Sequence, residues 1–185
     1  MKYRKKKEKI TIKDFLVKMK YSRSDISNDI LNLDRPAYIL DRKVPDNLNE
    51  ITFGQLCQLR HISSDQELIY MPLYILFNIR REIAEKCDAI TALAFANWIS
   101  KEVSRINKTF NSIQVKPTKE EIRAGIEKLN FGEFGIVDYY ARRMGIQDHN
   151  TVMSLPWKRI FKCMEMDTKT NEYKKTLQKI IYSKK

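Results

Sequence analysis

The chain has 185 residues, of which 43% are hydrophobic and 10% aromatic, enough for one sizeable core but hardly for two independent domains. No stretch reaches the run of about 18 apolar residues typical of a membrane span, and no apolar segment follows the charged N-terminus as in a secretory signal. We therefore expect a cytoplasmic chain without membrane contact. Three widely spaced cysteines favour reduced thiols over a disulfide framework.

The net charge of +12 is concentrated at the N-terminus. Residues 1–23 contain ten lysines and arginines against two acidic residues, a local charge of +8. Such a block binds phosphate backbones or acidic protein surfaces without reading sequence, but it is also typical of a solvated, solubilising tail. Both interpretations stay open. The candidate contact residues are Arg4, Lys5, Lys6, Lys7 and Lys9.

Residues 1–50 are predicted to form a basic N-terminal arm. Thr11, followed by Asp14, predicts a short amphipathic helix over 11–19. Residues 24–50 are rich in Asp, Asn and Ser and contain two prolines, which favours irregular backbone with one strand at "AYIL". We place the boundary between this arm and a helical body, residues 51–185, near residue 50.

The body contains repeated helix-start signals. A hydroxyl residue followed three positions later by Glu or Gln is the signature of a capping box. It occurs at Thr52 with Gln55, Ser64 with Glu67, and Thr118 with Glu121. These boxes predict helices over 53–62, 65–79 and 119–129, and Asp88 and Asp148 predict caps for helices over 89–110 and 149–155.

Three further helices complete the expected body. One covers 133–144 and ends at Gly145, and another begins at Pro156 with Trp157 on its inner face. A separate last helix is expected to turn Tyr173, Leu177, Ile180 and Ile181 inward. The fold class is therefore mainly α, a compact bundle of about six to eight helices with an extended basic arm.

The sequence contains no catalytic or metal-binding signature. Cys57 and His61 have a spacing that suits two ligands on one helix, but two ligands do not make a site. His149 has no Cys or Ser partner in sequence, and the glycines near residue 132 lack the phosphate-binding patterns. We therefore expect no enzymatic activity, no metal and no cofactor.

An aromatic-rich segment, "FGEFGIVDYYARRMGIQDHNTVMSLPW" at 131–157, stands out in a lysine-rich chain. Aromatic and arginine side chains concentrated together suit a protein interface, although ordinary core is the competing interpretation. The candidate interface residues are Phe131, Phe134, Tyr139, Tyr140, Arg142, Arg143 and Trp157. A helix-turn-helix of a DNA-binding regulator is a weaker alternative, because the helix after Gly145 is short and mostly apolar.

Several stretches in this order resemble small proteins of the structural and tail-assembly module of tailed bacteriophages, closest to the Bacteroides-infecting crAss-like type. These stretches are "VPDNLNEITFGQL", "NWISKEVSRI", the segment from "KPTKEEIRAGIEKLNF" to "SLPWKRIF", and "NEYKKTLQKI". The resemblance covers about residues 44–181 and leaves the basic arm outside it.

Two roles are implied by this resemblance. One is a virion ring or connector subunit of the portal–tail region, assembled in the host cytoplasm, whose partners are its own copies, the portal or adjacent tail rings. The other is a tail assembly chaperone that is absent from the finished particle. In the first role the arm would lie across a neighbouring subunit.

Overall fold

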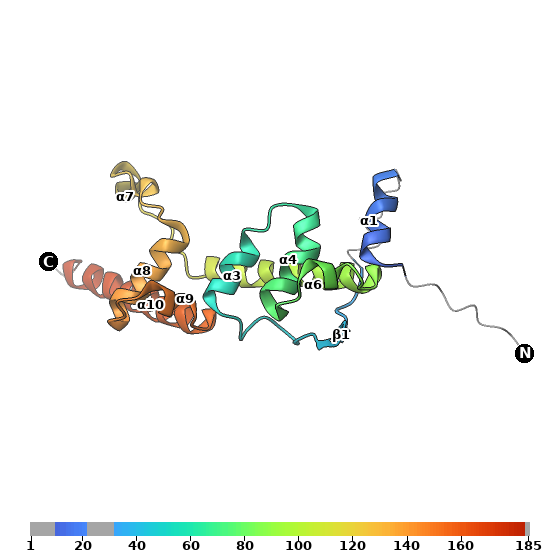
Figure 1. Ribbon diagram of the computed structural model, residues 1–185. Helices are drawn as coiled ribbons and strands as arrows, with labels where there is room; N and C mark the ends of the chain where they lie inside the picture. The colour runs from blue at the N-terminus through green and yellow to red at the C-terminus, as the bar shows by residue number, and fades with distance from the viewer. Residues whose placement is uncertain (1–9, 22–31, 184–185) are drawn as a thin grey trace, which may run out of the picture. The chain divides into compact units, whose positions relative to one another are not determined.

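The structure is a computed structural model, and it describes residues 10–21 and 32–183. This part of the chain is mainly helical, as predicted, with one small hairpin (Figure 1). Its elements are α1 (Ile12–Tyr21), β1 (Tyr38–Ile39), β2 (Arg42–Lys43), α3 (Phe53–Arg60), α4 (Asp65–Phe77), α5 (Arg81–Ala84), α6 (Ala89–Asn111), α7 (Lys119–Arg123), the 3-10 helix η1 (Ile126–Lys128), α8 (Gly132–Met144), α9 (His149–Met153) and α10 (Trp157–Tyr182). None of the described helices is long and apolar enough to cross a membrane.

The chain divides into two units, and the division does not follow the expected boundary near residue 50. Unit 1 comprises the described residues of Met1–Leu48 and Gln58–Val103. Unit 2 comprises Asn49–Cys57 and the described residues of Ser104–Lys185. The division falls within helices α3 and α6.

Helix starts follow the caps predicted from sequence. Thr52 and Gln55 form reciprocal hydrogen bonds: the Gln55 backbone nitrogen donates to Thr52 Oγ1 at 3.1 Å, and the Thr52 backbone nitrogen donates to Gln55 Oε1 at 3.0 Å. Thr118 and Glu121 form the same reciprocal box, and the Ser64 hydroxyl accepts from the backbone nitrogen of Glu67. These local contacts satisfy amide groups that have no partner within the helix, which is why a short sequence pattern is sufficient to position them.

The described part of the expected arm is integrated into the core of unit 1. Ile12, Ile39, Val44 and Leu48 are all buried. Backbone hydrogen bonds join the start of α1 to the segment before α6, with the Ile12 nitrogen 3.0 Å from the Cys87 oxygen. The segment "AYIL", expected as a single strand, contributes β1, which pairs with β2 in an antiparallel hairpin. These apolar residues are therefore part of the core of unit 1.

Aromatic rings dominate the core of unit 2. Phe110 of α6 lies 5.8 Å from the Trp157 ring and 5.5 Å from the Phe161 ring, centroid to centroid. The start of α10 is tied to the start of α3, because the Trp157 nitrogen donates to the Ile51 oxygen and the Phe53 nitrogen to the Leu155 oxygen. Helices α8 and α9 pack beside this cluster. The core therefore fixes α8 and α10 at the positions that shape the candidate site.

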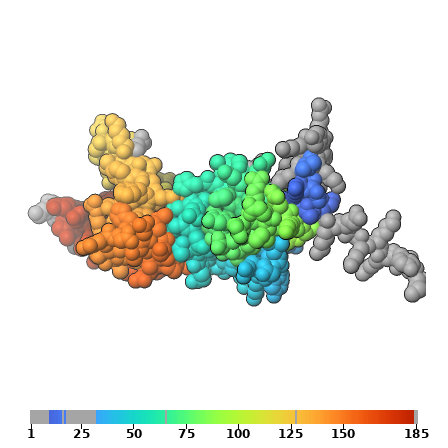
Figure 2. All heavy atoms as spheres, viewed as in Figure 1, coloured from blue at the N-terminus to red at the C-terminus, as the bar shows by residue number. Residues whose placement is uncertain are grey.

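Two helix predictions were wrong in extent. The helix expected over 119–129 stops at Arg123, because Gly125 takes a left-handed backbone with φ of +84° and the chain continues as η1. Figure 2 shows this segment, in yellow, projecting from the packed α8–α10 region. The two helices expected after Pro156 are one helix, α10, of 26 residues. Its four residues expected to face inward, Tyr173, Leu177, Ile180 and Ile181, are exposed.

Candidate functional site

The most distinctive surface of unit 2 is a groove of about 750 Å³ along one face of α8. Each lining residue has another three or four positions away along the chain, so they share one side of the helix and of its first turn. They are Phe131, Phe134, Gly135, Asp138, Tyr139, Arg142 and Arg143. We call this surface the α8 groove. It combines apolar rings at one end with charged side chains at the other.

Phe131 and Phe134 present their rings to solvent at the start of α8. Their side chains are 65% and 64% exposed, unusual for two neighbouring phenylalanines in one short segment. Gly135 permits this arrangement, because a Cβ at that position would lie 3.0 Å from the Phe131 Cβ. Large apolar groups that remain exposed beside one another indicate a binding surface.

The charged end of the groove is held by a hydrogen-bond network with α10. The Tyr139 hydroxyl donates to Asp167 Oδ2, and the same carboxylate accepts two hydrogen bonds from the Arg143 guanidinium, each 2.9 Å long. A two-point contact between planar groups fixes orientation as well as distance. Tyr139 and Arg143 are therefore positioned before any partner binds.

The network shifts the acid–base equilibria of its members. Hydrogen bonds from Arg143 and then from Tyr139 lower the pKa of Asp167. Burial, followed by the hydrogen bond to Asp167, raises the pKa of Tyr139 to about 12. Hydrogen bonds to Asp167 and Tyr139 raise the pKa of Arg143. At neutral pH the site therefore holds one carboxylate, one guanidinium and one neutral phenol.

We expect the Tyr139 phenol to have a pKa of about 12 in the folded protein, whereas in the unfolded chain its pKa would be the ordinary value of about 10. Because the folded-state pKa is the higher one, its contribution to stability is complete below pH 10 and is lost as pH rises towards 12. The measurement is the ultraviolet absorbance of tyrosinate, compared between the wild type and Tyr139→Phe. If the tyrosinate absorbance lost on this substitution rises near pH 10 in the wild type, the result contradicts the hydrogen-bond network.

A second set of contacts organises the apolar end. The Asp138 carboxylate pairs with Arg142 at 2.9 Å, and its other oxygen lies 3.8 Å from His149 Nε2. The His149 ring meets the Phe134 ring edge-on, with centroids 5.3 Å apart. His149 is the first residue of α9, which Asp148 caps as predicted. Helix α9 thus braces one wall of the groove.

Five of the seven interface residues proposed from sequence line this groove, and two do not. Phe131, Phe134, Tyr139, Arg142 and Arg143 lie together on α8. Tyr140 and Trp157 are 0% and 2% exposed and belong to the core of unit 2, which corrects their assignment to a surface. Tyr140 follows Tyr139 directly, and successive helix residues point about 100° apart, so the pair is split between core and surface.

Three residues of the site were missed by sequence reasoning: Asp138, His149 and Asp167, which all contact groove residues. Asp138 stands four positions before Arg142, a spacing that favours an ion pair on one helix face and could have been noticed. Asp167 lies 24 positions from Arg143, and no local pattern joins them. The five arm residues Arg4, Lys5, Lys6, Lys7 and Lys9 lie outside the described residues.

The groove brings together two phenylalanine rings, one tyrosine, one carboxylate and two guanidinium groups. Among residues 10–21 and 32–183, no group of three or more His, Cys, Asp or Glu side chains is placed to hold a metal ion. Cys57 is buried, whereas His61, four positions later, is exposed. Phe131 and Phe134 can cover apolar groups of a partner. Arg142, whose side chain is 80% exposed, can pair with an anion.

Comparison of the chain with protein-family models, with curated proteins and with solved structures gives no match.

Proposed function

We propose that this protein is a non-enzymatic structural component of a phage virion, an oligomeric ring or connector subunit of the portal–tail assembly. Its α8 groove binds a neighbouring subunit. The observation that carries the proposal is the pair of exposed phenylalanines beside a guanidinium network already held in place by Asp167. The resemblance of residues 44–181 to small phage tail-module proteins supplies the class of assembly.

The groove has the composition of an interface hot spot. Such spots are enriched in aromatic and arginine side chains, and rigid side chains lose little conformational entropy on binding. Tyr139 and Arg143 are rigid because Asp167 holds both. Arg142 is paired with Asp138 on the same helix and remains largely exposed. A neighbour that covers Phe131 and Phe134 would thus meet groups that are already arranged.

Replacing Phe131 and Phe134 by alanine should abolish or strongly weaken self-association. Truncating hot-spot residues costs about 2 kcal/mol or more, equivalent to an affinity loss of about 30-fold. The measurement is sedimentation velocity of the full-length protein over a concentration series. Because both rings are mostly exposed, the circular dichroism spectrum should be unchanged.

Tyr38→Ala is the matched control, since this aromatic side chain is 60% exposed but belongs to unit 1. It should leave the oligomer intact. A wild-type protein that stays monomeric at all concentrations would contradict the proposal. If the double variant still forms the oligomer, the interface does not include the α8 groove.

The ring subunit and the tail assembly chaperone differ in one direct observable. A ring subunit is found in purified, nuclease-treated virions at a fixed ratio to the portal, whereas a chaperone is found only in infected cells. Mass spectrometry of both fractions distinguishes the two roles. Retardation of a specific DNA fragment at physiological salt would instead support the DNA-binding alternative.

A further inference from the structure

The apolar residues of helix α10 lie on one side in its first half and on the opposite side in its second half. Its first half turns Trp157 and Ile160 into the core of unit 2, with Phe161 and Met164 half-buried. The large apolar residues of its second half are exposed: Met166 54%, Tyr173 66%, Leu177 41%, Ile180 50% and Ile181 53%. At about 100° per residue, these five project from the side opposite to Trp157 and Ile160. They are a second stripe and not a continuation of the first.

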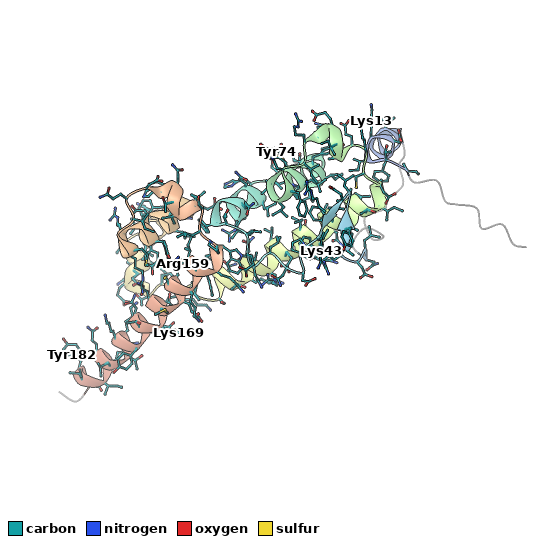
Figure 3. The ribbon with its side chains drawn as sticks, turned by 60° about the horizontal axis from the view of Figure 1, so that its bottom comes forward. Lys13, Lys43, Tyr74, Arg159, Lys169 and Tyr182 are labelled. Atoms are coloured by element: carbon teal, nitrogen blue, oxygen red, sulfur yellow. The ribbon has the colours of Figure 1, made fainter. Side chains whose placement is uncertain are left out.

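On the polar side of this second half, one lysine reaches another helix of unit 2. Lys175 lies on the same side as Trp157, and its Nζ is 3.8 Å from Glu121 of α7. Figure 3 shows the end of α10 that carries the labelled Lys169 and Tyr182 extending beyond the other helices of unit 2. Met166, Tyr173, Leu177 and Ile180, with Thr170 between them, follow at alternating steps of four and three, the spacing of a seam against another element.

The charges beside this stripe disfavour pairing with an identical stripe. Residues 162–182 contain five lysines and three acidic residues. Lys162 and Lys169 flank one side, where they share Glu165 at 2.7 and 2.8 Å, and Lys174 flanks the other. Two such helices side by side would bring lysine rows together, which costs free energy. The complementary surface is an apolar groove that carries carboxylates.

Unit 1 presents a groove of this kind between α4 and α5, with a volume of about 540 Å³. Its apolar wall includes Met71 and Tyr74, which are exposed, and Tyr74 is labelled in Figure 3. Glu67 and Glu82 supply two carboxylates, and Arg80 and Arg81 supply two guanidinium groups. Arg81, also in the lining, is occupied by Glu85 at 3.3 Å and stacks 4.7 Å above the Tyr70 ring. We call this surface the α4–α5 groove.

We propose that the second half of α10 docks into the α4–α5 groove of a second copy of this chain. Leu177 and Ile180 cover the apolar wall, and Lys174 approaches the carboxylates of Glu67 and Glu82. The two patches are different, so the contact is head-to-tail and generates a ring if the rotation closes. The inference rests on the proposed oligomer, to which it adds a second interface distinct from the α8 groove.

The first test is sedimentation velocity of the full-length protein with Leu177→Asp and Ile180→Asp combined. Both side chains are exposed, so the circular dichroism spectrum should be unchanged, while self-association should weaken by about tenfold or more. The control Ile90→Asp changes another exposed isoleucine, on α6, and should have no effect. A wild-type oligomer that the α10 variant leaves unchanged would overturn this inference alone, whereas a wild-type monomer would overturn the proposed function as well.

The second test identifies the groove by charge exchange. Lys174→Glu should weaken self-association, as should Glu67→Lys combined with Glu82→Lys, and mixing these two variants should restore it. Lys179→Glu is the matched control, because Lys179 lies on the same helix, away from the stripe. Failure of the mixture to associate would overturn the α4–α5 groove as the receptor. Co-sedimentation with phosphatidylserine vesicles that depends on Leu177 and Ile180, without self-association, would assign the stripe to a lipid surface instead.

Discussion

Trp157→Ala is expected to lower the stability of unit 2 by about 3–5 kcal/mol, the usual cost of removing a large buried aromatic side chain. The Trp157 side chain is 2% exposed and meets the rings of Phe110 and Phe161 at centroid distances of 5.8 and 6.3 Å. Its backbone nitrogen also anchors α10 to Ile51. Urea unfolding followed by far-ultraviolet circular dichroism measures the change.

The fluorescence of the remaining tryptophan makes this experiment more informative. Trp98 belongs to unit 1, so in the Trp157→Ala variant all tryptophan emission reports that unit. Tyr182→Ala is the control on the same helix, because Tyr182 is 71% exposed and such substitutions usually change stability by less than about 0.5 kcal/mol. A loss below about 1 kcal/mol for Trp157→Ala would contradict the aromatic core described for unit 2.

Phe95→Ala should have a comparable effect on unit 1, about 3–5 kcal/mol. The Phe95 side chain is fully buried in the middle of α6, between the rings of Phe77 and Trp98 at 5.8 and 5.7 Å. Removing it leaves a cavity beside two other aromatic rings of this core. Urea unfolding followed by Trp98 emission in a Trp157→Phe background measures the loss.

The control for Phe95→Ala is Ile90→Ala on the same helix, where the side chain is 65% exposed. It should change the unfolding free energy by less than about 0.5 kcal/mol. Equal effects of the two substitutions would show that α6 does not bury the Phe95 face. Together with Trp157→Ala, the pair tests whether the units unfold separately, because each variant damages one core only.

The α8 groove and the exposed half of α10 are linked through one residue. Asp167 holds Tyr139 and Arg143 of α8, and it directly follows Met166, the first residue of the exposed stripe. The network therefore fixes the rotation of α10 at the point where its apolar face changes sides. In the proposed ring, the two interfaces would be positioned by the same short contact.

The sequence by itself determined the helical class and most helix starts. The caps at Thr11, Thr52, Ser64, Asp88 and Thr118 all form as expected. A cap joins groups three residues apart, so its energetics are local and can be read from a short pattern. The buried residues Phe95, Ile99 and Ile106 of α6 also follow helical spacing, which decides which side chains share a face.

Only the tertiary structure decided which apolar faces are covered. Tyr139 and Tyr140 are neighbours in sequence, yet Tyr139 lines the groove and Tyr140 is buried, because successive helix residues point about 100° apart and only one of these two directions faces the core of unit 2. The stripe at Tyr173, Leu177 and Ile180 has the same spacing as a core stripe but no described element of unit 2 covers it. Periodicity shows that a helix has an apolar face. Which element covers that face depends on contacts between residues distant in sequence, such as Arg143 with Asp167.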